Sequence, residues 1–201
     1  MGPVPPELIG AARLTLVPLR PGHAAEMALV LADPDLYTFT GGAPPQAAEL
    51  RVRFERWAAG PGDPALSWDN WVIQLCGQGA LAGYVQATVT DTAGTLAAEV
   101  AWVVGKPWQG RGIGSEAAQA LAGWLGRHYV RSIVAHIHPD NRASAAVASA
   151  VGLTRTGEWQ DGEQRWRMTL APCAGGRGSR TGPAAPPARR GHRGPGAEGG
   201  K

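Results

Sequence analysis

The sequence predicts an α/β fold that forms a single domain. An apolar, strand-like run passes directly into a glycine-rich loop and a helical pattern over residues 103–128, and a second strand and helix pattern follows over residues 132–152. A chain of 201 residues with 44% hydrophobic residues is large and apolar enough to bury a substantial core. These observations favour one globular domain that contains both strands and helices.

The N-terminal half adds a strand and a helix. Apolar and polar residues alternate over Arg13–Leu19, which predicts a half-buried strand, and the apolar residues of His23–Asp33 recur with a helical period. No such pattern precedes them. We therefore expect residues 1–11 to be a flexible N-terminus and residues 12–170 to form the domain.

The segment from Val103 to Ala117 reads VVGKPWQGRGIGSEA and is the most informative part of the chain. Gly110, Gly112 and Gly114 occupy alternate positions just before a predicted helix. Without Cβ atoms their backbone N–H groups are unshielded, and the helix that follows directs the positive end of its dipole at them. The segment therefore predicts a binding site for a phosphate or pyrophosphate group.

Spacing excludes two well-known phosphate loops. A P-loop requires a lysine directly after its last glycine, and none is present. In a Rossmann fold the glycines follow the first strand directly and an acidic residue comes about 20 residues later. Here the turn 105–109 intervenes and no acidic residue stands at that offset. A flexible glycine turn that caps an ordinary helix remains an alternative at this point.

The chain after the loop continues with a helix, a strand and a second helix. Ser115–His128 carries apolar residues at helical spacing, and Ser132–Ile137 is a short apolar run typical of a buried strand. An alanine-rich helix is then predicted to begin at Asn141 and to end at Gly152.

Two of these segments resemble signatures of the GNAT (GCN5-related N-acetyltransferase) family. QGRGIG, from Gln109 to Gly114, fits the Q/R-x-x-G-x-G/A pyrophosphate loop, and NRAS leading to VGL at 151–153 fits the family's second signature. The resemblance covers roughly residues 13–170. Within the family, 33–45 and 98–103 are similar to the bacterial ribosomal-protein-alanine acetyltransferases and related small-amine acetyltransferases.

The resemblance implies a fold and a cofactor. The fold is a mixed, mostly antiparallel seven-strand sheet with helices on both faces, and the co-substrate is acetyl-CoA. Its thioester and pantetheine arm would lie against Trp102, Val103 and Val104, where the N–H of Val103 or of Val104 would polarise the carbonyl. Asn141 would hydrogen-bond the pantetheine arm, a role compatible with a plain N-cap. The pyrophosphate would lie on the loop, formed by Gln109, Gly110, Arg111, Gly112, Ile113 and Gly114.

Two residues are candidates for proton transfer. Glu99 stands four residues before Val103 and so shares its strand face, where a carboxylate suits deprotonation of an amine, although a solvent-exposed glutamate is the alternative. Many family members carry a tyrosine seven residues after the asparagine, but this chain has Ala148 there. The resembling branch has serine at the third position, and Ser144 is therefore the candidate acid.

Candidates for the acceptor and for a metal come from isolated features. The aromatic residues Tyr37, Phe39, Trp68 and Trp71 are candidate contacts of the acceptor, although tryptophan is more often a core residue. His136 and His138 form an H-x-H pair, but no third ligand has sensible spacing. We therefore expect no metal site.

Charge is concentrated at the C-terminus. Residues 171–201 carry six basic residues and one acidic residue, a charge of +5, so that the rest of the chain carries −2 of the overall +3. This tail is rich in Gly, Pro and Arg and poor in large apolar residues, which predicts disorder. A solvated extension without a role is one interpretation, and a contact with RNA is another.

The sequence therefore predicts a cytoplasmic N-acetyltransferase that is a monomer or a homodimer. Two cysteines without paired spacing, no signal-peptide pattern and no apolar run of 18 residues lead to the expected location. A primary amine is the expected acceptor: a protein N-terminus, an amino acid or an amine-bearing antibiotic. The alternatives are another acyl-CoA or an aminoacyl-tRNA as donor, and a CoA-binding sensor or partner protein that has lost its chemistry.

Overall fold

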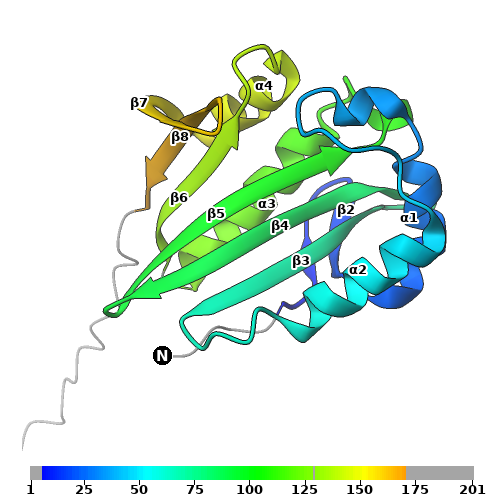
Figure 1. Ribbon diagram of the computed structural model, residues 1–201, viewed down its shortest axis with the longest axis horizontal. Coiled ribbons are helices and arrows are strands. Elements are labelled where there is room, and N and C mark those ends of the chain that lie inside the picture. The colour runs from blue at the N-terminus through cyan, green and yellow to red at the C-terminus, as the bar shows by residue number, and fades with distance from the viewer. Residues whose placement is uncertain (1–5, 129, 171–201) are drawn as a thin grey trace, which may run out of the picture.

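The computed structural model describes residues 6–128 and 130–170. Their strands form one sheet with the order β1-β2-β3-β4-β5-β6-β8-β7, in which only β5 and β6 are parallel (Figure 1). The strands are β1 (Ile9–Gly10), β2 (Leu14–Pro18), β3 (Leu66–Leu75), β4 (Leu81–Thr92), β5 (Thr95–Val104), β6 (Val130–Ile137), β7 (Thr154–Gln160) and β8 (Glu163–Thr169). The helices are α1 (Ala24–Val30), α2 (Ala47–Ala59), α3 (Ile113–Arg127) and α4 (Arg142–Val151), with the short 3-10 turns η1 (Pro21–His23), η2 (Pro34–Tyr37) and η3 (Lys106–Trp108).

The mixed, mostly antiparallel sheet confirms the predicted fold class, but the strand count is eight among the described residues and not seven. The additional strand is β1, which lies in the segment expected to be flexible. Ile9 pairs with Leu16 and is only 5% exposed, and Trp71 Nε1 donates a hydrogen bond to the carbonyl of Glu7. A flexible N-terminus that extends to residue 11 is therefore wrong for this part, because buried contacts hold it. Residues 1–5 lie outside the described part of the chain, as do residues 171–201 with the predicted tail.

Helices cover both faces of the sheet, as the resemblance implied. Figure 1 shows α1 and α2 in front of the sheet and α3 behind it. The larger core lies on the side of α3 and α4, and it contains Trp71, Trp124 and Ala148. The smaller core lies under α1 and α2, around Met27 and Phe54. The even-numbered residues of β5 from Leu96 to Val104 pack in or against the larger core, and Val103 packs against the smaller one, so the two faces of this strand are distinguished.

The parallel strands β5 and β6 separate before they end. Their pairing runs from Leu96–Val130 to Glu99–Val134, although β5 continues to Val104 and β6 to Ile137. Figure 1 shows the two strands diverging toward the end at which α4 begins. The edge of β5 from Val100 to Val104 is thus unpaired on the β6 side, and we call it the open edge of β5.

Local sequence determines where the two helices beside this edge begin. Gly112 is the N-cap of α3, with φ of 75°, and the side chain of Asn141 caps α4 by accepting a hydrogen bond from the Ser144 N–H. Gly152, with φ of 99°, ends α4 as predicted. The observed α3 begins at Ile113, two residues before the predicted start, because helical hydrogen bonding begins as soon as the glycine cap allows it.

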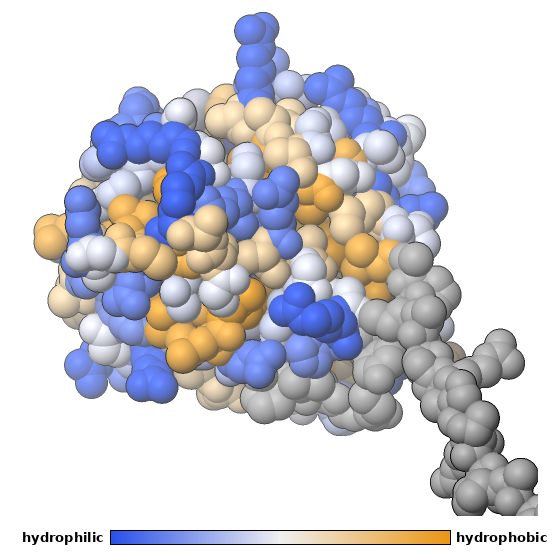
Figure 2. All heavy atoms as spheres, turned by 180° about the vertical axis from the view of Figure 1, so that it is seen from behind, coloured by the Kyte–Doolittle hydropathy of each residue, from blue (hydrophilic) through white to orange (hydrophobic). Residues whose placement is uncertain are grey.

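The back of the molecule, on the α3 side, has a mixed surface. Figure 2 shows hydrophobic groups there in patches separated by hydrophilic side chains. Among the described residues, none of the helices is both long and apolar enough to span a bilayer.

Candidate functional site

The open edge of β5 carries backbone N–H groups, and the pairing of β5 with β4 determines which of them point away from β4. The N–H of Gly105 donates to the carbonyl of Ala82, the residue opposite it in the antiparallel ladder with β4. Because N–H groups alternate sides along a strand, the N–H of Val103 also points to β4, whereas those of Trp102 and Val104 point away from it. Of the two amides left open by the sequence, the register therefore selects Val104. The side chains of Trp102 and Val104 pack against the larger core, so only their backbone faces the edge.

The glycine loop lies between the open edge and α3. Gly110 and Gly112 have φ of 71° and 75°, a conformation that glycine adopts without strain. A Cβ atom on Gly110 would have no neighbour within 4 Å, so the loop backbone there borders open space. The first turn of a helix leaves its N–H groups without intrahelical partners. Those of Ile113, Gly114 and Ser115 have no acceptor within residues 6–128 and 130–170.

Side chains tie this loop to the sheet at both ends. The backbone N–H and the Nε of Arg13 donate to the carboxylate of Glu116 at 2.7 and 2.6 Å, and its Nη1 donates to the carbonyl of Arg111 at 3.0 Å. At the other end, Gln109 Nε2 donates to the carbonyl of Val104 at 2.9 Å. The loop is thus fixed to the segment before β2 and to the end of β5.

Two glycines outside the loop allow close approaches beside the open edge. A Cβ on Gly83 of β4 would lie 2.0 Å from the carbonyl oxygen of Val103. A Cβ on Gly105 would lie 2.8 Å from both the backbone and the side chain of Val30 at the end of α1. Any other residue at either position would displace the end of β5.

Helix α4 begins next to the glycine loop. A Cβ on Gly114 would meet side chains of Val104 and Val147 at 3.4 and 3.3 Å, so glycine lets α3, α4 and β5 converge. Asn141 uses its Oδ1 for the cap, and this leaves its Nδ2 as a donor for a ligand. Ser144 is partly buried in the first turn, and Ala148 is fully buried in the core.

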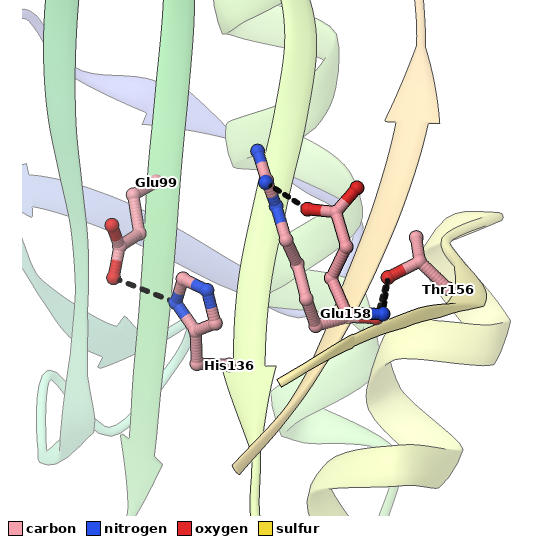
Figure 3. A network of polar contacts seen from close by, with 5 residues as sticks. Glu99, His136, Thr156 and Glu158 are labelled. Atoms are coloured by element: carbon pink, nitrogen blue, oxygen red, sulfur yellow. Dashed lines mark hydrogen bonds and ion pairs between the residues drawn. The ribbon is translucent and has the colours of Figure 1, made fainter. Parts of the chain in front are cut away.

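Glu99 lies on the same face of β5 as Val103, which is the α1 and α2 face, and 58% of its side chain is exposed. Its Oε1 lies 3.1 Å from Nδ1 of His136 on β6, one strand away (Figure 3). The contact stands beside the last residue pair before the two strands diverge. The structure therefore joins Glu99 to a histidine that the sequence had offered only as half of a metal pair.

An ion pair stands beside the Glu99–His136 contact. Arg165 of β8 is opposite His136 in the ladder, and its Nη1 binds Glu158 of β7 (Figure 3). The Thr156 hydroxyl accepts a hydrogen bond from the Glu158 N–H. The other histidine of the predicted pair, His138, stacks on Phe39 with 5.1 Å between ring centroids. Among the described residues, no group of three or more His, Cys, Asp or Glu side chains is placed to hold a metal ion.

Two of the aromatic candidates come from the segment after α1. The Tyr37 hydroxyl donates to the carbonyl of Leu31 at 3.0 Å, and Phe39 reaches His138 beyond the end of β6. Lys106 of η3 holds Asp35 of η2 at 2.6 Å, and this contact raises the pKa of the Lys106 ammonium. The segment from η2 to Phe39 thus connects the end of β5 with the end of β6.

The other two aromatic candidates lie on opposite faces of the sheet. Trp68 is on the α1 and α2 face, in one row with Thr88 and Glu99, two strands from the carboxylate. Trp71 is fully buried in the larger core on the opposite side of the sheet, where its ring meets Trp124 edge-on at 5.1 Å. Odd and even positions of β3 face opposite sides, and Trp71 is therefore a core residue that no acceptor reaches.

Sequence reasoning missed three residues of this arrangement. Gly83 had a signal, because an isolated glycine inside a strand pattern often marks a close backbone approach. His136 had only the H-x-H pattern, and the pairing of β5 with β6 was needed to bring it to Glu99. Arg13 had no signal, because its partner Glu116 is 103 residues away.

Comparison with known proteins agrees with this geometry. Residues 13–154 match the family described as the acetyltransferase (GNAT) domain. The chain belongs to the GNAT family of acetyltransferases. As a member, it is an acyl-CoA-dependent N-acyltransferase, and acetyl-CoA is its co-substrate. No curated protein matches the chain.

Several solved structures are similar to this GNAT protein over nearly their whole length. A GNAT acetyltransferase from Bacillus anthracis is 21% identical, with a TM-score of 0.67 over 81% of this chain and 98% of the other. The ribosomal alpha-N-protein acetyltransferase RimL, in complex with coenzyme A, is 22% identical, with a TM-score of 0.66 over 82% and 98%. The microcin C7 self-immunity acetyltransferase MccE, in complex with acetyl-CoA and AMP, is 19% identical, with a TM-score of 0.65 over 79% and 93%. At these identities the three likenesses show a shared fold.

Proposed function

We propose that this protein transfers an acetyl group from acetyl-CoA to a primary amine by direct attack of the amine on the thioester. The observation that carries the proposal is the glycine loop beside the open edge of β5. Gly110 borders open space, the N–H groups of Ile113, Gly114 and Ser115 have no acceptor among the described residues, and the N–H of Val104 points away from β4. One ligand that is anionic at one end and carries a carbonyl at the other would use both features.

The residues present fit coenzyme A. The N–H groups of the loop and of the first turn of α3 would hold the pyrophosphate, and the Arg111 guanidinium adds a charge-assisted contact. The open edge of β5 would pair with the amides of the pantetheine arm, with Asn141 Nδ2 as a further donor. Bound there, acetyl-CoA supplies an activated acyl group and a leaving thiolate.

The chain's own residues supply the rest of the chemistry. The Val104 N–H would hydrogen-bond the thioester oxygen and stabilise the charge that develops on it. The Glu99–His136 pair would receive the proton that the amine must lose before it attacks. Ser144, in the first turn of α4, would donate a proton to the departing thiolate, because the buried Ala148 replaces the tyrosine of many relatives.

The acceptor would approach on the face of Glu99. Trp68, Tyr37 and Phe39 are the proposed contacts, because Trp68 lies in the row of Glu99 and the other two lie on the segment held by Lys106. A protein N-terminus is favoured as the acceptor by the likeness to RimL, an alpha-N-protein acetyltransferase, and a small amine is the other candidate.

Release of coenzyme A thiol tests the proposal. The full-length protein is mixed with acetyl-CoA and a panel of amines that includes N-terminal peptides, amino acids and aminoglycosides. We expect thiol release and an acetylated product, identified by mass spectrometry, with at least one of these classes. Binding of coenzyme A by calorimetry without thiol release from any amine would instead indicate a sensor or partner protein.

The proton donor is tested in the same assay. Ser144→Ala should lower kcat by about tenfold at most, because a thiol with the pKa of free cysteine is a tolerable leaving group near neutral pH. Ser149→Ala, an exposed position near the end of α4, is the matched control. A loss of several hundredfold would assign Ser144 a larger role than proton donation, and an unchanged kcat would assign thiolate protonation to solvent.

A further inference from the structure

The imidazole of His136 has a second ring nitrogen that does not contact Glu99. Its Nδ1 lies 3.1 Å from the Glu99 carboxylate, whereas the other ring nitrogen, Nε2, points away from Glu99 (Figure 3). Nε2 has no protein partner within residues 6–128 and 130–170. A carboxylate that accepts a hydrogen from one ring nitrogen fixes the tautomer in which the other nitrogen carries a lone pair. The ring thus presents a proton acceptor on its free side.

The register places this acceptor nearer to the open edge than Glu99 is. The last pair is Glu99–Val134, so that the same register continued by two residues sets His136 level with Ala101. Ala101 is small and exposed, and it leaves room beside the ring. Along β5, His136 is therefore two residues closer than Glu99 to Val104, whose N–H would hold the thioester oxygen.

Charged groups on three strands surround the ring. Glu99 faces it from β5, Arg165 stands opposite it on β8, and Glu158 on β7 binds Arg165. Phe39, which follows η2, and His138, which follows β6, stack on each other. Arg165 is thus paired with an acid of the neighbouring strand, whereas Glu99 faces the imidazole directly.

We infer that His136 Nε2 accepts the proton of the acceptor amine, and that Glu99 is the positioning residue that fixes the imidazole. This inference rests on the proposed acetyl transfer. An ammonium group gives one proton to Nε2, which passes it to solvent. The free amine then forms the N–C bond as the C–S bond breaks, Ser144 gives its proton to the thiolate sulfur, and the proton in excess on nitrogen returns to Ser144. The products are the acetamide and coenzyme A thiol.

The test combines kinetics, pH dependence and chemical rescue. His136→Ala should lower kcat at saturating acetyl-CoA by about 10²–10⁴-fold and remove the acidic limb of the pH–rate profile. It should leave the Kd for coenzyme A within about twofold, because the imidazole is outside the loop. Added imidazole should restore part of the rate to His136→Ala but not to Glu99→Gln, which keeps its histidine. His136→Gln is a second variant that can still hydrogen-bond Glu99, and His23→Gln, on η1, is the matched control.

Each other outcome overturns the inference in an identifiable way. If His136→Ala and His136→Gln keep the acidic limb while Glu99→Gln loses it, Glu99 is itself the base. If both residues can be replaced with little loss of kcat, solvent is the base. A wild-type protein that binds coenzyme A but acetylates no amine removes the proposed function and this inference with it, whereas an active wild type with an unaffected His136→Ala removes the inference alone.

Discussion

Single glycines of the loop determine whether its backbone can face a pyrophosphate. Gly112 combines a φ of 75° with the N-cap of α3, and the nearest group to a Cβ there would be Arg13 Nη2 at 3.3 Å. Gly112→Val should therefore weaken coenzyme A binding by at least about tenfold, ~1.4 kcal/mol, because it strains the cap and covers the amides. Calorimetry on a variant that melts as a folded protein measures this. An unchanged Kd in such a variant would remove pyrophosphate binding from this loop.

Arg13 acts on the same loop from a distance. It donates to both Glu116 and the Arg111 carbonyl, and it alone connects the segment before β2 with the loop through side-chain hydrogen bonds among the described residues. Arg13→Ala should raise the Kd for coenzyme A by about tenfold, comparable to the loss of one charge-assisted hydrogen bond. Arg51→Ala, which breaks an exposed ion pair on α2, is the control and should leave the Kd unchanged. Equal Kd values for the two variants would show that the loop holds its shape without Arg13.

The strands around the site depend on close backbone packing. β4 and β5 are neighbours along their whole length, and Gly83 lets them meet at the level of the open edge. Gly83→Ala should destabilise the fold by about 1–3 kcal/mol, because the new Cβ would lie 2.0 Å from the Val103 oxygen and force the strands apart. It should also lower kcat/KM for acetyl-CoA by displacing the Val104 N–H.

Gly157→Ala is the matched control for this prediction. Gly157 lies in β7, at the edge of the sheet, and a Cβ there would have no neighbour within 4 Å. Thermal denaturation of the three proteins gives the comparison. Equal melting temperatures for Gly83→Ala and the wild type would mean that β4 and β5 adjust without cost, and the predicted loss in kcat/KM should then be absent as well.

The burial of one carboxyl group, that of Asp69, lowers the stability of the whole protein when the group is ionised. Asp69 of β3 is 5% exposed, and burial raises its pKa from 3.8 to about 6, with partial compensation from the hydrogen bond of Ser67 and from the charge of His128. The folded protein therefore binds this proton more tightly than the unfolded chain does. Stability falls as the pH rises from about 4 through 6, and the full cost is present above that range.

Asp69→Asn should thus stabilise the protein at pH 8 by up to about 3 kcal/mol, the equivalent of roughly two pKa units. The gain should shrink below pH 6 and disappear near pH 4. Melting temperatures between pH 4 and 8 measure it, with the exposed Glu55→Gln on α2 as the control. A constant difference between Asp69→Asn and the wild type over this pH range would show that the burial of Asp69 has no electrostatic cost.

Much of the fold and of the local structure of the candidate cofactor site was predictable from the sequence because both depend on local pattern. The alternation of Arg13–Leu19, the glycines of the loop and the cap at Asn141 act through neighbouring residues, and the structure has a strand, a positive-φ loop and a capped helix there. Residues 6–11 were mispredicted because nothing in their own pattern shows that Trp71 and Trp124 hold Glu7.

The sequence by itself thus determined the fold class, the family and the position of the glycine loop, since each depends on residues that are close together in the chain. The tertiary structure alone decided which amide of β5 is open, which tryptophan is buried and which histidine meets Glu99. These three depend on strand register, and a register is set by the packing of distant strands on a common core. The pairing of β5 with β6 stops at Glu99, and that single end point creates both the open edge and the Glu99–His136 contact.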